Sequence, residues 1–331
     1  MQEKINNNVS ITISAVRFPL ALLVVYIHSV GDANAPLYDF RLFFSIDFLC
    51  FVVPTYFILS GFLFAWDINN DADWYKTKLK KRVHTLLIPY IIWNTITLIL
   101  DYAKYYKGAS SWLDYSNIIN WGQILFYGYI DYMPINMPLW YIRDLMVLVL
   151  FSPLLYVLIK KFCLFTFVVV AIYYFIDVGP FIIHLVSVMF FLLGMILGMT
   201  HTILLLKCRF VAICVFVAFT AISIYKFLGW HWALNIYCLT MPFLFIYIIS
   251  KVICNESIRN GLIELGKFSK FIYFSHYPIT LILSIKIISA LLPEYSMLNY
   301  VVIPILAVII SVVIQITLKK VLAVVNVFYR L

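Results

Sequence analysis

Long apolar stretches recur along this 331-residue chain, and each approaches the roughly 20 residues that an α-helix needs to cross a bilayer. Ten such stretches lie near residues 11–30, 46–66, 85–101, 139–159, 163–178, 182–200, 210–226, 233–250, 272–291 and 301–318. The stretches are continuous and lack the two-residue alternation of a transmembrane β-barrel. The pattern therefore predicts an all-α, polytopic integral membrane protein with about ten transmembrane helices.

The composition excludes a soluble fold. The chain is 64% hydrophobic and only 12% charged, and its mean hydropathy is +0.99. A soluble domain would have nothing against which to bury so much apolar surface. We expect residues 1–331 to form a single membrane-embedded domain, with no soluble domain appended to it.

The basic residues predict how the chain is oriented. With the N-terminus in the cytoplasm, seventeen of the 24 Lys and Arg residues fall in cytoplasmic segments and four fall in outer segments. This asymmetry agrees with the positive-inside rule and places both termini in the cytoplasm. It also explains the net charge of +9 without a nucleic-acid partner. Membrane lipids are the expected surroundings.

The six cysteines show neither a CxxC pair nor a metal-binding spacing. They are Cys50, Cys163, Cys208, Cys214, Cys238 and Cys254. Most lie in or beside apolar stretches, so we expect them to be small hydrophobic core residues and expect no metal site.

Two ionisable residues interrupt the first apolar stretch. Arg17 and His28 are eleven positions apart, which places them on nearly the same face of a helix and roughly 16 Å apart along its axis. Ionisable groups at membrane depth are costly and usually face a protein interior or a wet cavity. The alternatives are that Arg17 extends to a lipid headgroup and that His28 marks the outer interface. We select both as candidate catalytic residues.

The second stretch carries Ser60 and Gly61, and a dense basic segment containing Lys81 and Arg82 follows it. Small residues allow either close helix packing or a locally opened helix that lines a cavity, and alone they favour packing. As cavity-lining positions they are candidates for cofactor binding. The basic segment fits an orientation signal with anionic lipid binding, or a receptor for a phosphorylated cytosolic ligand.

Polar residues also stand at the ends of two later stretches. Trp140, Arg143 and Asp144 begin the fourth stretch, and His276 lies about one turn into the ninth. Arg143 and Asp144 are sequence neighbours that point about 100° apart, so we expect partners on another helix rather than a pair between them. These four residues are candidates for substrate binding, whereas His184 fits a satisfied core or interface histidine.

The longest outer segment, residues 102–138, is rich in tyrosine and tryptophan. Such a segment fits a membrane-interface belt or a platform on which sugars stack, and the belt is the preferred interpretation.

Taken together, these motifs resemble the acyltransferase 3 family of integral-membrane O-acyltransferases. The resemblance rests on Arg17 and His28, followed in order by VPTYFILSG, KKRVHTLLIPY, LWYIRDLMVLVLFSPL and FSKFIYFSHYPI. It covers essentially the whole chain. It implies a ten-helix fold in a bacterial cytoplasmic membrane that transfers an acyl group, usually acetyl, from cytoplasmic acyl-CoA to a hydroxyl of a cell-surface or lipid-linked saccharide.

The resemblance also implies roles for individual residues. The arginine and histidine tied to activity in the family correspond to Arg17 and His28, with His28 as a base or a transient acyl carrier. The family's basic segment carries two arginines three positions apart, whereas this chain has Arg82 and then Thr85. That departure puts the phosphate contacts of the donor, acetyl-CoA, in question. Arg82 and Lys81 would hold its nucleotide end.

A transporter or flippase for a saccharide or lipid intermediate is the alternative from another class, because polar residues on membrane helices also mark substrate pathways. Binding of acyl-CoA separates the two classes. The sequence leaves open the acceptor, the length of the acyl group and the oligomeric state, with a homodimer as one possibility.

Overall fold

The computed structural model describes residues 7–31, 37–66, 68, 72–108, 133–176, 183–200, 208–292 and 297–325. Every regular element within these residues is a helix. The main helices are α1 (Asn7–Ile27), α3 (Val52–Ala65), α4 (Ala72–Arg82), α5 (Ile88–Tyr106), α7 (Trp140–Leu150), α8 (Ser152–Ile176), α9 (Leu185–Met199), α10 (Cys208–Leu228), α11 (His231–Val252), α12 (Glu256–Gly266), α13 (Ser269–Ser275), α14 (Leu281–Leu291) and α15 (Met297–Val325). The aromatic part of the outer segment, residues 109–132, lies outside the described residues.

Shorter helices join these elements. They are the five-residue α-helix α2 (Tyr38–Leu42), the 3₁₀ helix η4 (Met137–Leu139), and three π-helices, η1 (Phe43–Phe48), η2 (Val83–Leu87) and η5 (His276–Thr280). π-Helical turns are rare and occur frequently at functional sites. Here η5 contains His276, one of the predicted site residues.

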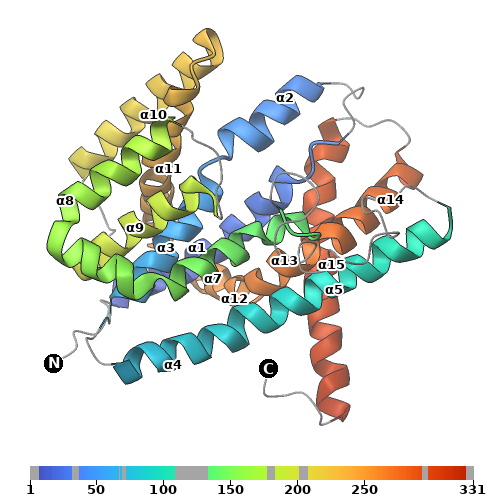
Figure 1. Cartoon of the computed structure of the whole chain (residues 1–331). Coiled ribbons are helices and arrows are strands. Elements are labelled where there is room, and N and C mark those ends of the chain that lie inside the picture. The colour runs from blue at the N-terminus through green and yellow to red at the C-terminus, as the bar shows by residue number, and fades with distance from the viewer. Residues whose placement is uncertain are drawn as a thin grey trace.

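Helix α1 lies between two groups of helices. Helices α3 and α8–α11 gather on one side of the molecule, whereas α13–α15 gather with α5 on the other (Figure 1). Accordingly, α1 contributes Val16 and Leu20 to the larger hydrophobic cluster and Ala21 and Val25 to the smaller one. Residues of α1 are thus placed at the junction of the two groups.

The prediction of a polytopic membrane protein is confirmed. Eight helical segments of the described residues are long and apolar enough to cross a membrane. They are Asn8–Ile27, Tyr38–Ala65, Asp73–Tyr106, Ser152–Ile176, Val211–Leu228, His231–Val252, Ser269–Leu291 and Met297–Val321. Figure 1 shows that α4 and α5 run end to end as one long rod.

The remaining two predicted spans correspond to shorter helices. Helix α9 has 15 residues, and the stretch predicted at 139–159 is divided between α7 and the start of α8. Pro153, in the first turn of α8, lacks the N–H that a continuous helix would need there. The predicted break between 159 and 163 appears as a kink in α8, where Phe162 leaves helical geometry (φ −139°, ψ 42°).

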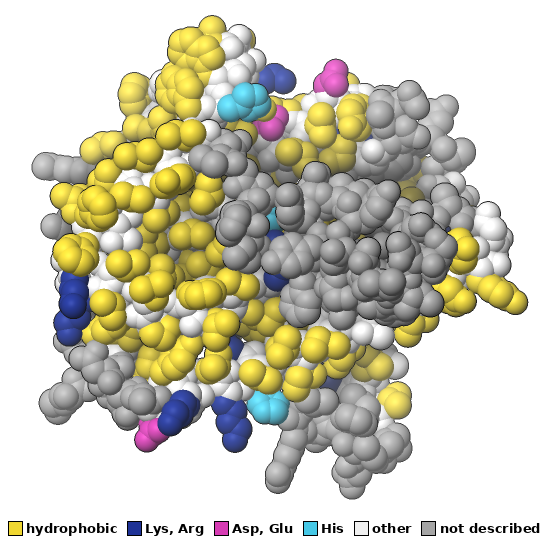
Figure 2. Space-filling view, in the orientation of Figure 1, with side chains coloured by type: hydrophobic (Ala, Val, Ile, Leu, Met, Phe, Trp, Pro, Cys, Tyr) yellow, Lys and Arg dark blue, Asp and Glu magenta, His cyan; other side chains and the backbone are white. Residues whose placement is uncertain are grey.

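The surface agrees with a membrane environment. Hydrophobic side chains cover most of the described part of the face in Figure 2, whereas Lys and Arg gather toward its margins. Large apolar residues are strongly exposed, among them Leu164 (76%), Phe165 (71%) and Phe216 (73%). Contiguous apolar surface on this scale is stable in lipid and not in water.

Three glycines allow α3 and α9 to pack in close contact. A Cβ atom on Gly61 would collide with the carbonyl oxygen of Phe191, and one on Gly194 would collide with that of Ile58. A Cβ on Gly198 would lie 2.6 Å from the carbonyl oxygen of Phe62. Small residues serve this purpose in membrane helices. The packing interpretation of Gly61 is therefore the one that the structure supports.

The expectation for the cysteines needs correction. Cys50, just before α3, forms a disulfide with Cys238 of α11, and Cys163 and Cys254 are exposed. Only Cys214 matches the predicted buried thiol among the described free cysteines. The prediction was wrong because outward positions on membrane helices are as apolar as inward ones, so hydropathy cannot distinguish a core cysteine from an exposed one.

Candidate active site

The fold brings two distant histidines together. His28 follows Ile27 at the end of α1, and its backbone N–H donates to the carbonyl of Val25 at 3.2 Å. Its half-buried ring lies 5.3 Å, centroid to centroid, from the ring of His276 in η5. The ring of Tyr277 lies 6.3 Å from the His28 ring. One predicted catalytic residue is therefore adjacent to a residue that the sequence suggested for substrate binding.

His276 is completely buried and held at one ring nitrogen. Its Nδ1 lies 2.6 Å from the carbonyl oxygen of Tyr273, one helical turn earlier. Its Nε2 is buried and has no hydrogen-bond partner among the described residues. Burying a polar nitrogen without a partner is costly, so this atom is a feature that requires an explanation.

Neighbouring helices hold the turn that carries His276. Ser311 of α15 accepts a hydrogen bond from Ser275 at 3.0 Å and shares another with Thr280 at 3.1 Å. On the other side, Asn136 donates to the carbonyl of Tyr277 at 3.0 Å. These contacts stabilise a backbone that departs from α-helical hydrogen bonding, so the position of His276 depends on three separate segments.

Arg17 lies on α1 with its side chain accessible, and it makes no hydrogen bond or ion pair through its guanidinium with any described residue. The hydroxyl of Tyr56, on α3, lies 3.5 Å from the Arg17 carbonyl oxygen and within electrostatic range of the guanidinium. A Cβ added to Gly266, at the end of α12, would lie 3.9 Å from the Cβ of Arg17. Arg17 is thus surrounded by α3 and α12, with its donors available to a ligand.

A group of tyrosines occupies the space between these arginine and histidine positions. The Tyr141 ring lies 5.6 Å from that of Tyr56 and 5.8 Å from that of Tyr273. The Tyr141 hydroxyl shares a 3.0 Å hydrogen bond with Ser60 and is within electrostatic range of Arg82. Tyr273 in turn donates to the carbonyl of Pro138. Tyr141 is therefore bonded to Ser60 and lies in the electrostatic field of Arg82.

Two of the predicted cofactor-binding residues lie apart from this group. Lys81 is exposed on α4, whereas its neighbour Arg82 is half-buried. Gly61 faces α9, whereas Ser60 reaches Tyr141 of α7. Thr85, which stands where the family pattern has a second arginine, donates to the carbonyl of Lys81 at 2.9 Å.

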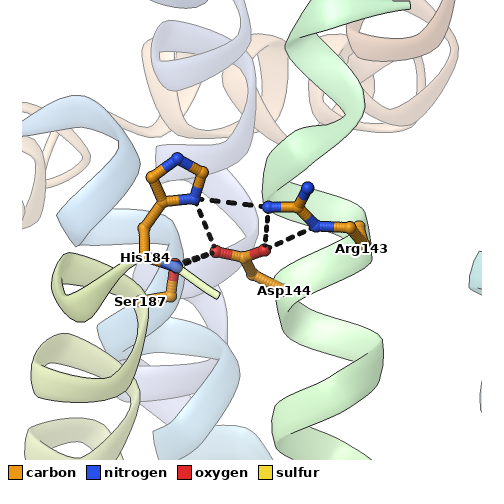
Figure 3. A network of polar contacts seen from close by, with 4 residues as sticks. All are labelled: Arg143, Asp144, His184 and Ser187. Carbon is orange, nitrogen blue, oxygen red and sulfur yellow. Dashed lines mark hydrogen bonds and ion pairs between the residues drawn. The ribbon is translucent and has the colours of Figure 1, made fainter. Parts of the chain in front are cut away.

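Arg143 and Asp144 form a closed buried network (Figure 3). Arg143 donates to Asp144 Oδ1 through Nε at 2.9 Å and through Nη2 at 2.7 Å. Asp144 Oδ2 accepts from the Ser187 hydroxyl at 2.7 Å and the His184 backbone N–H at 2.9 Å, and His184 Nδ1 lies 3.0 Å away. The prediction that Arg143 and Asp144 do not pair was wrong, because the long arginine side chain bends back across the 100° between them. The prediction of partners on another helix is confirmed.

Trp140 and His184 complete this corner. Their ring centroids are 4.5 Å apart, and the Trp140 ring lies 6.3 Å from that of Phe57. His184, at the N-terminus of α9, is a satisfied interface histidine, as predicted. Trp140 remains half-buried and thus partly accessible.

The sequence did not single out several residues that the structure places at this site. Tyr273 and Tyr277 flank His276, and Asn136 joins α5 to η5 through hydrogen bonds to Asn94 and Thr97. Asp101, buried on α5, is within electrostatic range of Tyr277. The available signal was the presence of Asn94, Thr97 and Asp101 at helical spacing within one apolar stretch.

A family model described as an acyltransferase domain matches residues 11–318. The chain belongs to this family. The match covers almost the whole chain, as the resemblance predicted.

One curated relative aligns with part of this chain. The succinoglycan biosynthesis protein ExoH of Rhizobium meliloti (strain 1021) is 30% identical over 169 residues. The aligned region covers 47% of this chain and 44% of that relative, so this chain matches less than half the relative's length. No solved structure matches the chain.

The candidate site carries ionisable and hydroxyl groups. Within the described residues, no group of three or more His, Cys, Asp or Glu side chains could hold a metal ion. The candidate site instead provides two histidines, a cluster of tyrosine hydroxyls and two arginines. Such groups can transfer a proton and bind an anion.

Proposed function

We propose that this protein is an O-acetyltransferase, which moves an acetyl group from cytoplasmic acyl-CoA to a hydroxyl of a cell-surface or lipid-linked saccharide. The observation that carries the proposal is the placement of the His28 ring beside the His276 ring, with 5.3 Å between their centroids. Arg17 lies on α1, the helix that leads to His28. Membership in the acyltransferase family and the aligned region of a succinoglycan biosynthesis protein support it.

Arg82 is the residue that we assign to the phosphates of the donor. It is half-buried, at the junction of α4 and η2, and it lies within electrostatic range of the Tyr141 hydroxyl. A guanidinium offers several donors in a fixed planar geometry and binds phosphate strongly. Lys81 adds an exposed positive charge beside it, and Ser60 fixes the orientation of Tyr141.

Arg17 and His28 would act on the reacting groups. Arg17, with its free donors, neutralises a phosphate near the pantetheine arm or orients the thioester carbonyl. His28 takes the proton of the acceptor hydroxyl, whose oxygen then attacks that carbonyl carbon. The new ester C–O bond forms as the thioester C–S bond breaks, and the departing thiolate takes the proton from His28. A general base of this kind typically contributes about 10²–10⁴-fold to the rate.

Arg143 and Asp144 are better suited to a positioning role than to direct contact with the acceptor. Both are buried, and the carboxylate of Asp144 is occupied by Arg143, His184 and Ser187. The network joins α7 to α9 and holds Trp140 against His184. We retain Trp140 as the residue whose accessible ring would stack on a sugar.

The proposed location is a bacterial cytoplasmic membrane, with the basic segments and both termini in the cytoplasm. The disulfide between Cys50 and Cys238 supports this orientation, because such bonds persist in oxidising compartments and the positive-inside pattern places both cysteines near the outer surface.

Binding and turnover of acetyl-CoA by the purified protein in nanodiscs would test the proposal. Arg82→Ala should weaken binding at least tenfold, since a charge-assisted hydrogen bond contributes about 1.5–3 kcal/mol. His28→Ala should retain binding and lose turnover. Lys76→Ala is the matched control, because Lys76 is an exposed cation on the same helix, paired with Asp73 at 3.6 Å.

Three results would change the assignment. If the folded wild-type protein binds no acyl-CoA at millimolar concentration, the transporter or flippase interpretation is favoured instead. Equal effects of Arg82→Ala and Lys76→Ala would remove Arg82 from the donor site. A base-labile acetyl group trapped on His28 would identify this residue as an acyl carrier rather than a base.

A further inference from the structure

The unpartnered nitrogen of His276 is the feature of this protein that the proposed chemistry leaves unexplained. The residue is fully buried, yet its Nε2 has no hydrogen-bond partner among the described residues. Its ring lies 5.3 Å from the His28 ring, with an angle of 37° between the planes. An unpartnered Nε2 atom therefore lies buried, at a cost in free energy, beside a histidine that is partly accessible.

The backbone determines which nitrogen of His276 carries the proton. A carbonyl oxygen can only accept a hydrogen bond, so the 2.6 Å contact with Tyr273 requires a proton on Nδ1. In the neutral ring, Nε2 is then a lone-pair acceptor. The hydrogen bonds of Ser275 and Thr280 to Ser311 hold this turn and keep the ring in place.

Burial separates the roles of the two rings. His28 is partly accessible, whereas His276 lies behind it with 0% of its surface exposed. A saccharide hydroxyl can therefore approach His28 more readily than His276. No hydrogen bond joins the two rings in this structure. Their 5.3 Å centroid separation is short enough for a turn of the His28 side chain to bring a ring N–H within hydrogen-bond distance of His276 Nε2, about 2.6–3.2 Å between heavy atoms.

We infer that His276 is a positioning residue for His28, with its Nε2 accepting a hydrogen bond from a ring N–H of His28 when the His28 side chain turns toward it. This inference rests on the proposed function. The resulting chain of hydrogen bonds runs from the Tyr273 carbonyl through His276 to His28 and then to the acceptor hydroxyl. It follows the general arrangement in which a base is oriented by a third group.

The hydrogen bond would fix the tautomer of His28. With one ring N–H directed at His276, the other ring nitrogen of His28 is unprotonated and faces the acceptor. When it takes the hydroxyl proton, both nitrogens of His28 carry hydrogen and the imidazolium is stabilised by His276. The proton then passes to the thiolate, which restores neutral His28 and leaves His276 unchanged.

The described surroundings of His276 contain few other groups that titrate. Tyr273 and Tyr277 belong to its own segment, and His28 faces it from α1. Serine and asparagine side chains supply the contacts from α15 and from the segment before η4. We therefore expect the effect of removing Nε2 to pass through His28.

The test compares His276→Phe with His276→Gln in nanodiscs. Phenylalanine keeps a ring and removes the acceptor, whereas glutamine keeps an acceptor oxygen at a similar distance from the backbone. We expect His276→Phe to lower kcat for transfer roughly 10–100-fold, the usual range for residues that orient a reacting group, with KM for acetyl-CoA unchanged. His276→Gln should recover part of that loss. In His28→Ala, adding His276→Phe should cause no further decrease.

Thr240→Val is the matched structural control, since it removes a hydroxyl that is bonded within its own helix, α11, while conserving volume. The inference is overturned if His276→Phe equals wild type, if Thr240→Val reproduces its kcat loss, or if the losses of His28→Ala and His276→Phe multiply. An inactive wild-type protein would instead contradict the proposed function. Acetyl-CoA binding, measured for every variant, shows whether each one is folded.

Discussion

The carboxylate of Asp144 is completely buried, and each of its oxygens has donors within 3.0 Å. Burying an ion is costly unless it is paired and hydrogen-bonded. Asp144 meets this requirement with Arg143 on its own helix and with the first turn of α9, where Ser187 and the His184 N–H donate. One residue therefore joins α7 to α9 beside the candidate site.

We expect replacement of the Asp144 carboxylate to cause a large loss of stability. Asp144→Asn would leave the Arg143 guanidinium, 4% exposed, without its counter-charge. Breaking a buried pair by removing one partner costs about 3–5 kcal/mol. We expect a clear decrease in the thermal unfolding midpoint in detergent, measured by tryptophan fluorescence.

The exposed pair of Glu264 and Lys267 provides the comparison for Asp144. These side chains are 66% and 61% exposed, and Glu264→Gln should change stability by no more than about 0.5 kcal/mol. Equal unfolding midpoints for Asp144→Asn and Glu264→Gln would show that the buried network does not stabilise the fold.

At the level of elements, α3 and α9 are packed through their backbones. Gly61 and Gly194 each leave room for a carbonyl oxygen of the other helix. Lipid tails are as apolar as leucine, so membrane helices associate through close van der Waals packing rather than through the hydrophobic effect. The α3–α9 contact is therefore sensitive to a single added methyl group.

Gly194→Ala tests this packing. Its Cβ would collide with the Ile58 carbonyl oxygen, and a backbone atom cannot move aside as a flexible side chain can. We expect a destabilisation of about 1–3 kcal/mol, the usual cost of overpacking, measured as a lower unfolding midpoint.

Gly261→Ala is the matched control for Gly194→Ala. Gly261 lies in α12 with no atom within 4 Å of the added Cβ. In an open helical position, alanine stabilises by about 0.4–1 kcal/mol. Equal unfolding midpoints for Gly194→Ala and Gly261→Ala would contradict the prediction. They would mean that α3 and α9 can move apart to accept the added methyl group.

For the whole molecule, the basic residues predict which ends of the helices face the cytoplasm. Cys254 is exposed between α11 and α12, on the side predicted to be cytoplasmic. Lys107 is exposed at the end of α5, on the opposite side. These two positions therefore report the two faces of the membrane.

Labelling with a membrane-impermeant maleimide tests this orientation. In a Cys163→Ser, Cys208→Ser, Cys214→Ser background, Cys254 should react only after permeabilisation. With Cys254→Ser added, a Lys107→Cys substitution should react in intact spheroplasts. The reverse pattern would place the basic segments outside and exclude a cytoplasmic donor site.

The sequence by itself determined the class of fold, because apolar stretches of bilayer length have no other stable environment. It also determined the membership in the acyltransferase family and selected His28, Arg17 and His276 as unusual ionisable residues. It predicted most helix positions for the same reason, since each span must be long and apolar regardless of its neighbours.

Only the tertiary structure decided which of these residues meet. Hydropathy is alike on the inward and outward faces of a membrane helix, so it could not reveal the Cys50–Cys238 disulfide or the close contact at Gly61. Nor could helical spacing reveal that Arg143 bends back to Asp144. The proximity of His28 to His276 depends on how α1 packs against η5, two segments from opposite ends of the chain. Contacts at such separation are set by packing, which no local pattern encodes.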